Sequence, residues 1–261
     1  MNTLLLKVLV TPALIGTASL AGRRWGHSVS GWLIALPLTT GPITLFLALS
    51  HGSAFAATAA AGTLSGGISQ AAFVAAYSQL AWHSKWPVTL AAAVLGFAIL
   101  TAVLQSLMLP LVPLCAVVFL VFILVLKALP RQADPNELSD ALPSRWDIPF
   151  RMVIATAFVV LITTLAPSLG PRLTGLLAPF PLFTATLAAF AQHQHGPGAA
   201  IRVLRGLLMG LFSYASFFFV LALLLVPAGI ALAFTVAILV MLTLQGISLW
   251  ILQRSPRVAD A

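Results

Sequence analysis

Residues 87–126 form an unbroken run without a charged side chain, and most of them are apolar. One membrane-crossing helix needs about 20 such residues, so this run of about 40 is long enough for two crossings. Pro110 and Pro113 give the chain a place to turn between them. Across the chain 61% of residues are hydrophobic and 7% are charged, against roughly 25% charged residues in a soluble domain. We therefore expect an integral membrane protein, which excludes soluble enzymes and secreted disulfide scaffolds.

The whole chain divides into nine candidate membrane helices, because clusters of Gly, Pro and charged residues separate its apolar stretches. The candidate spans cover residues 3–21, 29–50, 54–82, 87–108, 110–128, 148–166, 172–193, 198–225 and 227–253. The predicted fold class is therefore all-α, a polytopic transmembrane helix bundle of about nine spans.

The positive charges predict how the chain is oriented. With the N-terminus outside, Lys7 and Arg172 face outward and the other Lys and Arg residues face the cytoplasm, as the positive-inside rule requires. The cytoplasmic residues are Arg23, Arg24, Lys85, Lys127, Arg131, Arg145, Arg151, Arg202, Arg205, Arg254 and Arg257. The net charge of +8 has the same origin, so no nucleic-acid partner is expected. We predict a bacterial inner (plasma) membrane protein with an outer N-terminus and a cytoplasmic C-terminus.

The sequence also matches itself when it is shifted by 144 residues. Between residues 31 and 80, 16 of 50 positions are identical to residues 175–224, including the His-Gly pairs at 51 and 195. Each repeat holds four spans and one further span joins them, so the second repeat should be inverted, as in many secondary transporters. The predicted units are the first repeat at 1–109, a linking span at 110–129, a cytoplasmic loop at 130–147, the inverted second repeat at 148–254 and a cytoplasmic tail at 255–261.

A Gly-Leu…Pro-x-Pro helix, a polar hairpin and an Arg-containing helix follow one another in the second half. They are carried by Gly175, Leu176, Pro179, Phe180, Pro181, Gly198 and Arg202. This pattern resembles the small four-span GlpM-like membrane proteins. The first half has Gly31, Pro37 and Gly62, with Ala35 and Thr58 in place of a proline and the arginine. The chain thus resembles two such units in tandem, which implies a link to envelope polysaccharide (alginate) production and lends no catalytic residue.

All the carboxylates lie outside the predicted spans: Asp134, Glu137, Asp140, Asp147 and Asp260. Ionisable groups inside a membrane usually mark proton relays and cation pathways. Their absence from the spans favours a neutral, anionic or amphiphilic solute over a cation.

Prolines interrupt the second and seventh spans, with threonines beside them. A proline frees a backbone carbonyl, and such breaks are tolerated where the helix faces protein or a water-filled cavity. Pro42 and Pro179 fall in the same spans as the pathway residues. The predicted substrate pathway is Pro37, Thr40, Thr44, Pro181 and Thr184, with Ser69 and Ser213 on neighbouring spans. The alternative is two simple kinks in which each threonine bonds back to its own helix.

Three further groups of residues are candidates for a functional role. Gly62, Gly66, Gly206 and Gly210 form small-xxx-small pairs for helix packing, either within one chain or at the seam of a homo-oligomer. His51 and His195 close equivalent hairpins as candidate gates, or as ordinary interfacial histidines. Arg202 and Arg205 are candidate ligands of an anionic headgroup, or only a topology signal.

The leading function is a secondary transporter or flippase-like carrier that works by alternating access. The alternative is a non-transporting membrane component of envelope polysaccharide or lipid assembly. No enzyme is expected, because no nucleophile–base pair is visible, and His193-x-His195 supplies too few ligands for a metal. The expected partners are the lipid bilayer and a small solute, with no cofactor.

Overall fold

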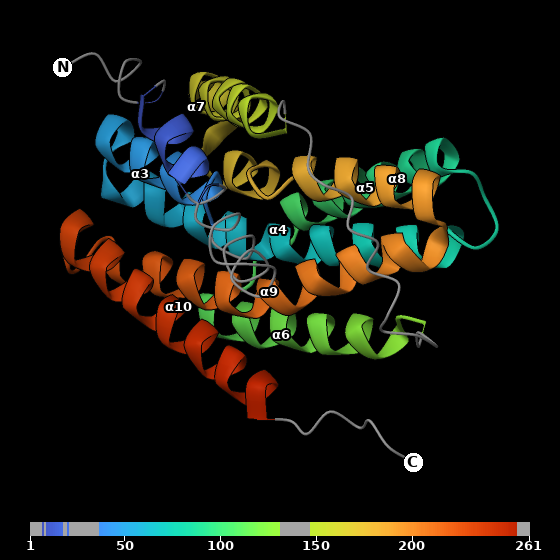
Figure 1. Cartoon of the computed structure of the whole chain (residues 1–261). Helices are drawn as coiled ribbons and strands as arrows, with labels where there is room; N and C mark the ends of the chain where they lie inside the picture. Colours follow the sequence, from blue (N-terminus) through green and yellow to red (C-terminus); the bar gives the residue numbers. More distant parts are fainter. Residues whose placement is uncertain (1–6, 8, 18–19, 21–36, 131–146, 255–261) are drawn as a thin grey trace.

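A computed structural model describes residues 7, 9–17, 20, 37–130 and 147–254, and every regular element in these ranges is a helix. Residues 9–17 are helical, followed by α3 (Thr40–His51), α4 (Ser53–Leu80), α5 (Trp86–Ser106), α6 (Leu111–Ala128), α7 (Asp147–Leu177), α8 (Leu182–His195), α9 (Pro197–Leu224) and α10 (Gly229–Arg254) (Figure 1). Residues 131–146 of the predicted loop at 130–147, the tail at 255–261 and parts of the first two predicted spans lie outside the described residues.

Several of these helices are suited to a lipid environment. In the described ranges, five segments are long and apolar enough to cross a membrane: Trp86–Ser106, Leu111–Ala128, Met152–Leu177, Pro197–Leu224 and Gly229–Ile247. Their outward faces expose large apolar side chains such as Ile99 and Leu239, which suits contact with lipid rather than water. The protein is therefore an integral membrane protein built from apolar helices.

The centre of the bundle is α4, which packs against α3, α5, α6, α7 and α9 (Figure 1). Its 28 residues are rich in Ala, Gly and Ser, and large side chains are few. Small residues let neighbouring backbones approach closely in a membrane. The helix is long enough to span, yet it is less apolar than the five segments above because protein, and not lipid, surrounds it.

The described parts of the second and seventh predicted spans each contain a short helix that begins after a break in the chain. α3 begins at Thr40, after a turn that follows Pro37, and α8 begins after a turn that ends at Pro181. Pro42 does not break α3, because it lies in the first turn of the helix, where proline is tolerated. The predicted break near Pro167 becomes a kink at Gly170, whose positive φ of 74° divides α7.

Matching elements recur at the same offset as the sequence repeat. α3 ends at His51 and α8 at His195, which are 144 residues apart, and so are both ends of α4 and α9. Gly52 and Gly196 join each pair with φ of 87° and 82°, a left-handed conformation that glycine adopts without the penalty of a Cβ. The local backbone of these two segments is therefore the same.

The long helices α4 and α9 lie side by side and run in opposite directions (Figure 1). α8 also runs opposite to α3, because its C-terminus lies at the end of α4 while the C-terminus of α3 lies at the start of α4. The side-chain amide of Gln192 fixes this arrangement by donating to the carbonyl oxygens of Ala81 at 3.1 Å and Ser84 at 2.9 Å. The helices α3 and α4 therefore have counterparts of opposite direction, α8 and α9.

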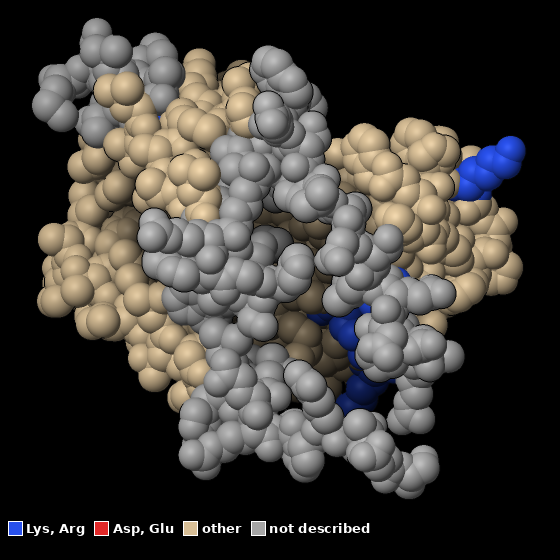
Figure 2. Space-filling model, in the orientation of Figure 1, with Lys and Arg blue, Asp and Glu red and all other residues tan. Residues whose placement is uncertain are grey.

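Cationic side chains gather at the end where α4 stops and α9 begins. Lys85 lies just before α5, Lys127 lies in the last turn of α6, and Arg202 and Arg205 lie near the start of α9. In Figure 2 the visible Lys and Arg side chains (blue) lie in the right half of the view, the side on which α4 ends and α9 begins in Figure 1. Arg172 lies away from this end: its carbonyl oxygen approaches Gly62 in the first half of α4, and its side chain donates to the carbonyl oxygens of Leu104 at 2.7 Å and of Leu107 at the C-terminus of α5.

Candidate functional site

The first half of the candidate pathway lies at the start of α3. The carbonyl oxygen of Pro37 accepts a hydrogen bond from the N–H of Gly41 at 2.8 Å, which starts the helix directly after the proline. Thr44 donates its hydroxyl to the carbonyl oxygen of Thr40 at 3.0 Å, so its side chain is satisfied within its own helix. Thr40 differs, because its hydroxyl is buried, at 4% exposure, and forms no hydrogen bond with the described residues.

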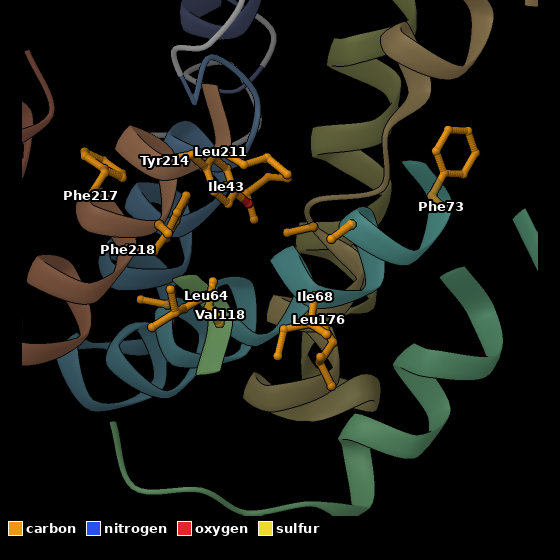
Figure 3. Close-up of a cluster of buried hydrophobic side chains, with 14 of the residues drawn as sticks. Ile43, Leu64, Ile68, Phe73, Val118, Leu176, Leu211, Tyr214, Phe217 and Phe218 are labelled. Atoms are coloured by element: carbon orange, nitrogen blue, oxygen red, sulfur yellow. The ribbon is translucent and has the colours of Figure 1, made fainter. Parts of the chain in front are cut away.

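Tyr214 of α9 faces this same point, and the sequence patterns did not single it out as a pathway residue. Its hydroxyl lies close enough to the Thr40 side chain to interact with it, but the pair lacks the geometry of a hydrogen bond. The Tyr214 side chain is 7% exposed, and in the part of the chain that the structure describes neither hydroxyl has another hydrogen-bond partner. Figure 3 shows Tyr214 and Leu211 pointing from α9 toward Ile43 of α3.

Aromatic rings line one side of this pair of hydroxyls. The ring of Phe218 lies 4.7 Å from that of Tyr214, and the ring of Phe217 lies 5.0 Å from Phe218 at an angle of 85°. Phe217 also reaches α3, because a Cβ added at Gly41 would lie 3.9 Å from its ring. The two hydroxyls therefore sit at the junction of α3 and α9, beside an aromatic surface.

The repeat has an equivalent point in the second matching segment, formed by α8 and α9, and it lies at the start of α8. The carbonyl oxygen of Pro181 accepts a hydrogen bond from Ala185 at 2.7 Å, which repeats the proline-led start of α3. Thr184, the counterpart of Thr40, is only partly buried. Gln70 of α4 occupies the position equivalent to Tyr214, and its buried side-chain oxygen also lacks a hydrogen-bond partner. Both segments thus carry a buried polar group at this position of the long helix.

These two starting points lie near the middle of the long helices. At 1.5 Å per residue, α3 is about 18 Å long and α8 about 21 Å, whereas α4 and α9 each extend about 42 Å. Because α3 and α8 begin near mid-length and run outward to opposite ends, Thr40 and Thr184 both lie well inside the bundle. Substrate sites of membrane carriers lie at this depth, where discontinuous helices begin.

The two pathway serines form different bonds. Ser69 of α4 is fully buried and accepts a hydrogen bond from Thr101 of α5 at 2.9 Å. Ser213 of α9 donates to the carbonyl oxygen of Gly210, three residues earlier in its own helix, at 2.9 Å. Ser69 therefore links two helices, whereas Ser213 satisfies itself locally, and neither serine bonds to the other.

The glycine pairs also behave differently. A Cβ at Gly62 would lie 2.5 Å from the carbonyl oxygen of Arg172, and one at Gly66 would lie 2.5 Å from the ring of Pro179. Gly175 approaches the backbone of Ala59 from the other side of this contact. These glycines let α4 touch the end of α7. A Cβ at Gly206 of α9 would meet no atom within 4 Å.

The two candidate gating histidines are both exposed, at opposite ends of the bundle. His51 stacks on Phe55 with ring centroids 4.7 Å apart, and His195 ends α8 beside Gly196. His193, two residues earlier, has its ring 6.2 Å from the ring of Trp86 on α5. Neither candidate reaches the buried hydroxyls of the pathway.

Arg205 caps a helix rather than pointing freely to the surface. Its guanidinium donates to the carbonyl oxygens of Leu129 at 3.4 Å and Pro130 at 3.1 Å, where α6 ends. Arg172 does the same for α5, and Gln192 for α4. A guanidinium at a helix C-terminus satisfies carbonyls that the helix leaves unpaired. No local sequence pattern indicates these caps, because each joins residues at least 65 positions apart.

Within the described ranges, no group of three His, Cys, Asp or Glu side chains could hold a metal ion. The polar groups that the fold buries together are hydroxyls and amides, which bind solutes by hydrogen bonds. Scans of family models, curated proteins and solved structures found no match to this chain. The resemblance to GlpM-like proteins therefore stays a prediction.

Proposed function

We propose that the protein is a secondary transporter or flippase-like carrier whose two halves form an inverted repeat. The observation that carries this proposal is the pair of half-length helices, α3 and α8. Each begins after a proline at an equivalent position, each ends at a His-Gly pair, and the two run in opposite directions. Carriers with inverted repeats place such discontinuous helices around a midplane site, and the two halves alternately open it to each side.

The direction of the other helices supports the same proposal. α4 and α9 have equivalent bounds and opposite directions, and α6 lies against both. A single joining helix between two four-helix units turns the second unit over. The described segment Leu111–Ala128 has the length and apolar character of that joining span.

The proposed orientation follows from the charged end of the bundle. Lys85, Lys127, Arg202 and Arg205 share one end, and Arg172 lies away from it, beside Gly62 in the other half of α4. The positive-inside rule assigns the first end to the cytoplasm of a bacterial inner membrane, with the N-terminus outside and the C-terminus inside.

The orientation can be tested with single cysteines in the full-length chain. In a Cys115→Ala background, we expect a membrane-impermeant maleimide to label His51→Cys in intact cells. His195→Cys should be labelled only after the membrane is permeabilised. Both positions are exposed at the ends of equivalent helices, so reactivity differs only through the side of the membrane. Labelling of both from the same side would contradict the inverted repeat.

Transport itself is tested by comparing a strain that lacks the gene with its parent. We expect one solute, inside or outside the cell, to change in concentration and to recover when the gene is restored. That solute can then be assayed for flux in liposomes that contain the purified protein.

A non-transporting role in envelope polysaccharide or lipid assembly is the second candidate. The close packing of α4 against α7 at Gly62 and Gly66 favours it, because backbone contact without intervening side chains restricts the movement of one half against the other. Loss of envelope polysaccharide without any redistribution of solutes would select this second function.

A further inference from the structure

The geometry points to a binding site for a neutral, hydroxyl-bearing solute of the sugar or polyol kind between the start of α3 and the middle of α9, formed by the hydroxyls of Thr40 and Tyr214. This inference rests on the proposed carrier function and names the class of its substrate. Both side chains are more than nine-tenths buried, and their hydroxyls form no hydrogen bond with the described residues. A buried polar group without a partner lowers the stability of the fold, and a solute oxygen that bonds to either hydroxyl would offset part of that loss.

The start of α3 offers few backbone donors to a ligand. The N–H of Gly41 already donates to Pro37, and that of Ile43 donates to Thr39 at 3.1 Å. Pro42, which lies between them, has no N–H. Anion sites at helix N-termini depend on several free N–H groups that point at the ligand. This terminus therefore lacks the free N–H groups that would bind a phosphate, and the side-chain hydroxyls are the main polar groups that a solute could contact.

The surroundings also disfavour a charged solute. Among the described residues, the groups that influence the Tyr214 hydroxyl include the Thr40 side chain but no charged side chain, and the first turn of α3 holds no acid. Burying an ion without a counter-charge is far more costly than burying a hydroxyl. The site thus selects uncharged oxygen groups from the neutral, anionic or amphiphilic solutes that the sequence allows.

The aromatic side of the site fits the remaining part of a sugar or polyol. A hydroxyl can both donate and accept, so Thr40 and Tyr214 can each bond to a solute hydroxyl. The rings of Tyr214, Phe217 and Phe218 meet at 4.7 and 5.0 Å and offer apolar surface to the C–H groups of the same solute. A polar edge beside an apolar wall is the usual composition of a small-molecule site.

The test measures binding and not flux, using the purified full-length protein in lipid nanodiscs. The probes are glycerol and glucose, with gluconate and glucosamine as anionic and cationic counterparts of glucose. We expect at least one neutral probe to raise the melting temperature of the protein in a saturable way, and both charged probes to leave it unchanged.

Two variants remove the proposed contacts with little change of shape, Thr40→Val and Tyr214→Phe. Each should weaken the apparent affinity for the neutral probe about tenfold, as expected for the loss of one buried hydrogen bond. Without a probe, each should melt at or above the temperature of the unmodified protein, because the unpartnered hydroxyl is gone. This second readout also shows that the variants are folded.

Two matched variants serve as controls. Thr63→Val removes a buried hydroxyl that is already bonded within α4, and Tyr77→Phe removes another buried phenol hydroxyl on α4 that lacks a hydrogen-bond partner among the described residues. Both should keep the full response to the neutral probe. If Tyr77→Phe lost the response as strongly as Tyr214→Phe, the site would not be at α3.

The outcomes separate this site from the carrier proposal. Binding that depends on Thr40 and Tyr214, without flux in liposomes, supports the site and contradicts the carrier. Flux that is unchanged in both variants overturns the site and leaves the carrier intact. Failure of both neutral probes to stabilise the protein, or stronger stabilisation by gluconate, overturns the assigned solute class.

Discussion

The helices α4 and α9 have the same length, equivalent bounds and the same preceding glycine turn, but they meet different surroundings. α4 lies among five helices and touches the backbone of α7 through Gly62 and Gly66. α9 carries large rings, among them Phe217 and Phe218, and leaves open space at Gly206. The same backbone pattern therefore supports a close backbone contact in one segment and aromatic packing in the other.

This difference shows that a repeated motif preserves helix geometry more strongly than it preserves contacts. Helix bounds depend on local signals such as Pro37, Pro181 and the glycine turns, and these recur in both halves. Contacts depend on the size of the facing side chains, which differ between the halves. The following substitutions test the comparison, from the largest expected effect to the smallest.

The largest difference in stability is expected between Gly62→Ala and Gly206→Ala, which substitute equivalent positions of the repeat. A methyl at Gly62 would press on the carbonyl oxygen of Arg172 and lie 3.2 Å from the Cα of Gly175. Overpacking of this kind costs about 1–3 kcal/mol and cannot be relieved by a side-chain rotation. At Gly206 the methyl meets open space, so better helix propensity should leave stability unchanged or raise it by up to about 1 kcal/mol. Thermal unfolding in nanodiscs measures both, and equal losses would contradict the asymmetry.

The next effect concerns the start of α9, where Arg205 stands at the position equivalent to Ala61 of α4. Arg205→Leu should lower the stability by about 1–2 kcal/mol, because two carbonyl oxygens at the end of α6 lose a charged donor. Arg205→Lys keeps the charge that directs insertion and should recover part of this loss. If the leucine and lysine variants melted at the same temperature, the cap would not contribute.

A smaller contrast should distinguish Ser69→Ala from Ser213→Ala. Loss of the Ser69 acceptor breaks a bond between α4 and α5, and such bonds in membrane proteins contribute about 0.6 kcal/mol on average. Ser213→Ala removes only a bond within α9 and should change the stability by less than about 0.3 kcal/mol. A double-mutant cycle with Thr101→Val isolates the bond between the helices, and a coupling energy of zero would show that the contact is not stabilising.

The smallest effect is expected at the two exposed histidines. His51→Ala and His195→Ala should each change the stability by less than about 0.5 kcal/mol, as surface substitutions commonly do. His51 should show the larger change of the two, because its ring stacks on Phe55. A loss of several kcal/mol in either variant, measured in the same unfolding assay, would mean that the hairpins hold the bundle together.

Much of the fold could be predicted from local features of the sequence. Long apolar runs indicate membrane helices, and prolines and glycines mark where α3, α8 and the kink of α7 begin or break. The lengths of the interrupted helices were harder to predict, because Pro42 stands only a few residues after Pro37 and yet remains within α3. A proline ends a helix in its interior but is tolerated in its first turn, and only the observed start of α3 distinguishes the two cases.

The candidate site was predicted only in part. Thr40 follows from its place beside a proline, whereas Tyr214 gave no signal because a single tyrosine in an apolar helix usually belongs to the core. Its meeting with Thr40 depends on how α9 packs against α3, across 174 positions of the chain. The caps made by Arg172, Gln192 and Arg205 depend on distant packing in the same way.

The sequence by itself determined that the protein consists of apolar helices suited to a membrane, and where several of them break, because hydrophobicity and backbone restriction act over a few neighbouring residues. The tertiary structure decided that α4 occupies the centre, that its glycines contact α7, and that Thr40 and Tyr214 face each other with no other hydrogen-bond partner among the described residues. Those outcomes depend on the shapes of surfaces that the chain brings together from distant positions. Equivalent residues such as Gly62 and Gly206 can therefore share a backbone conformation and still have different roles.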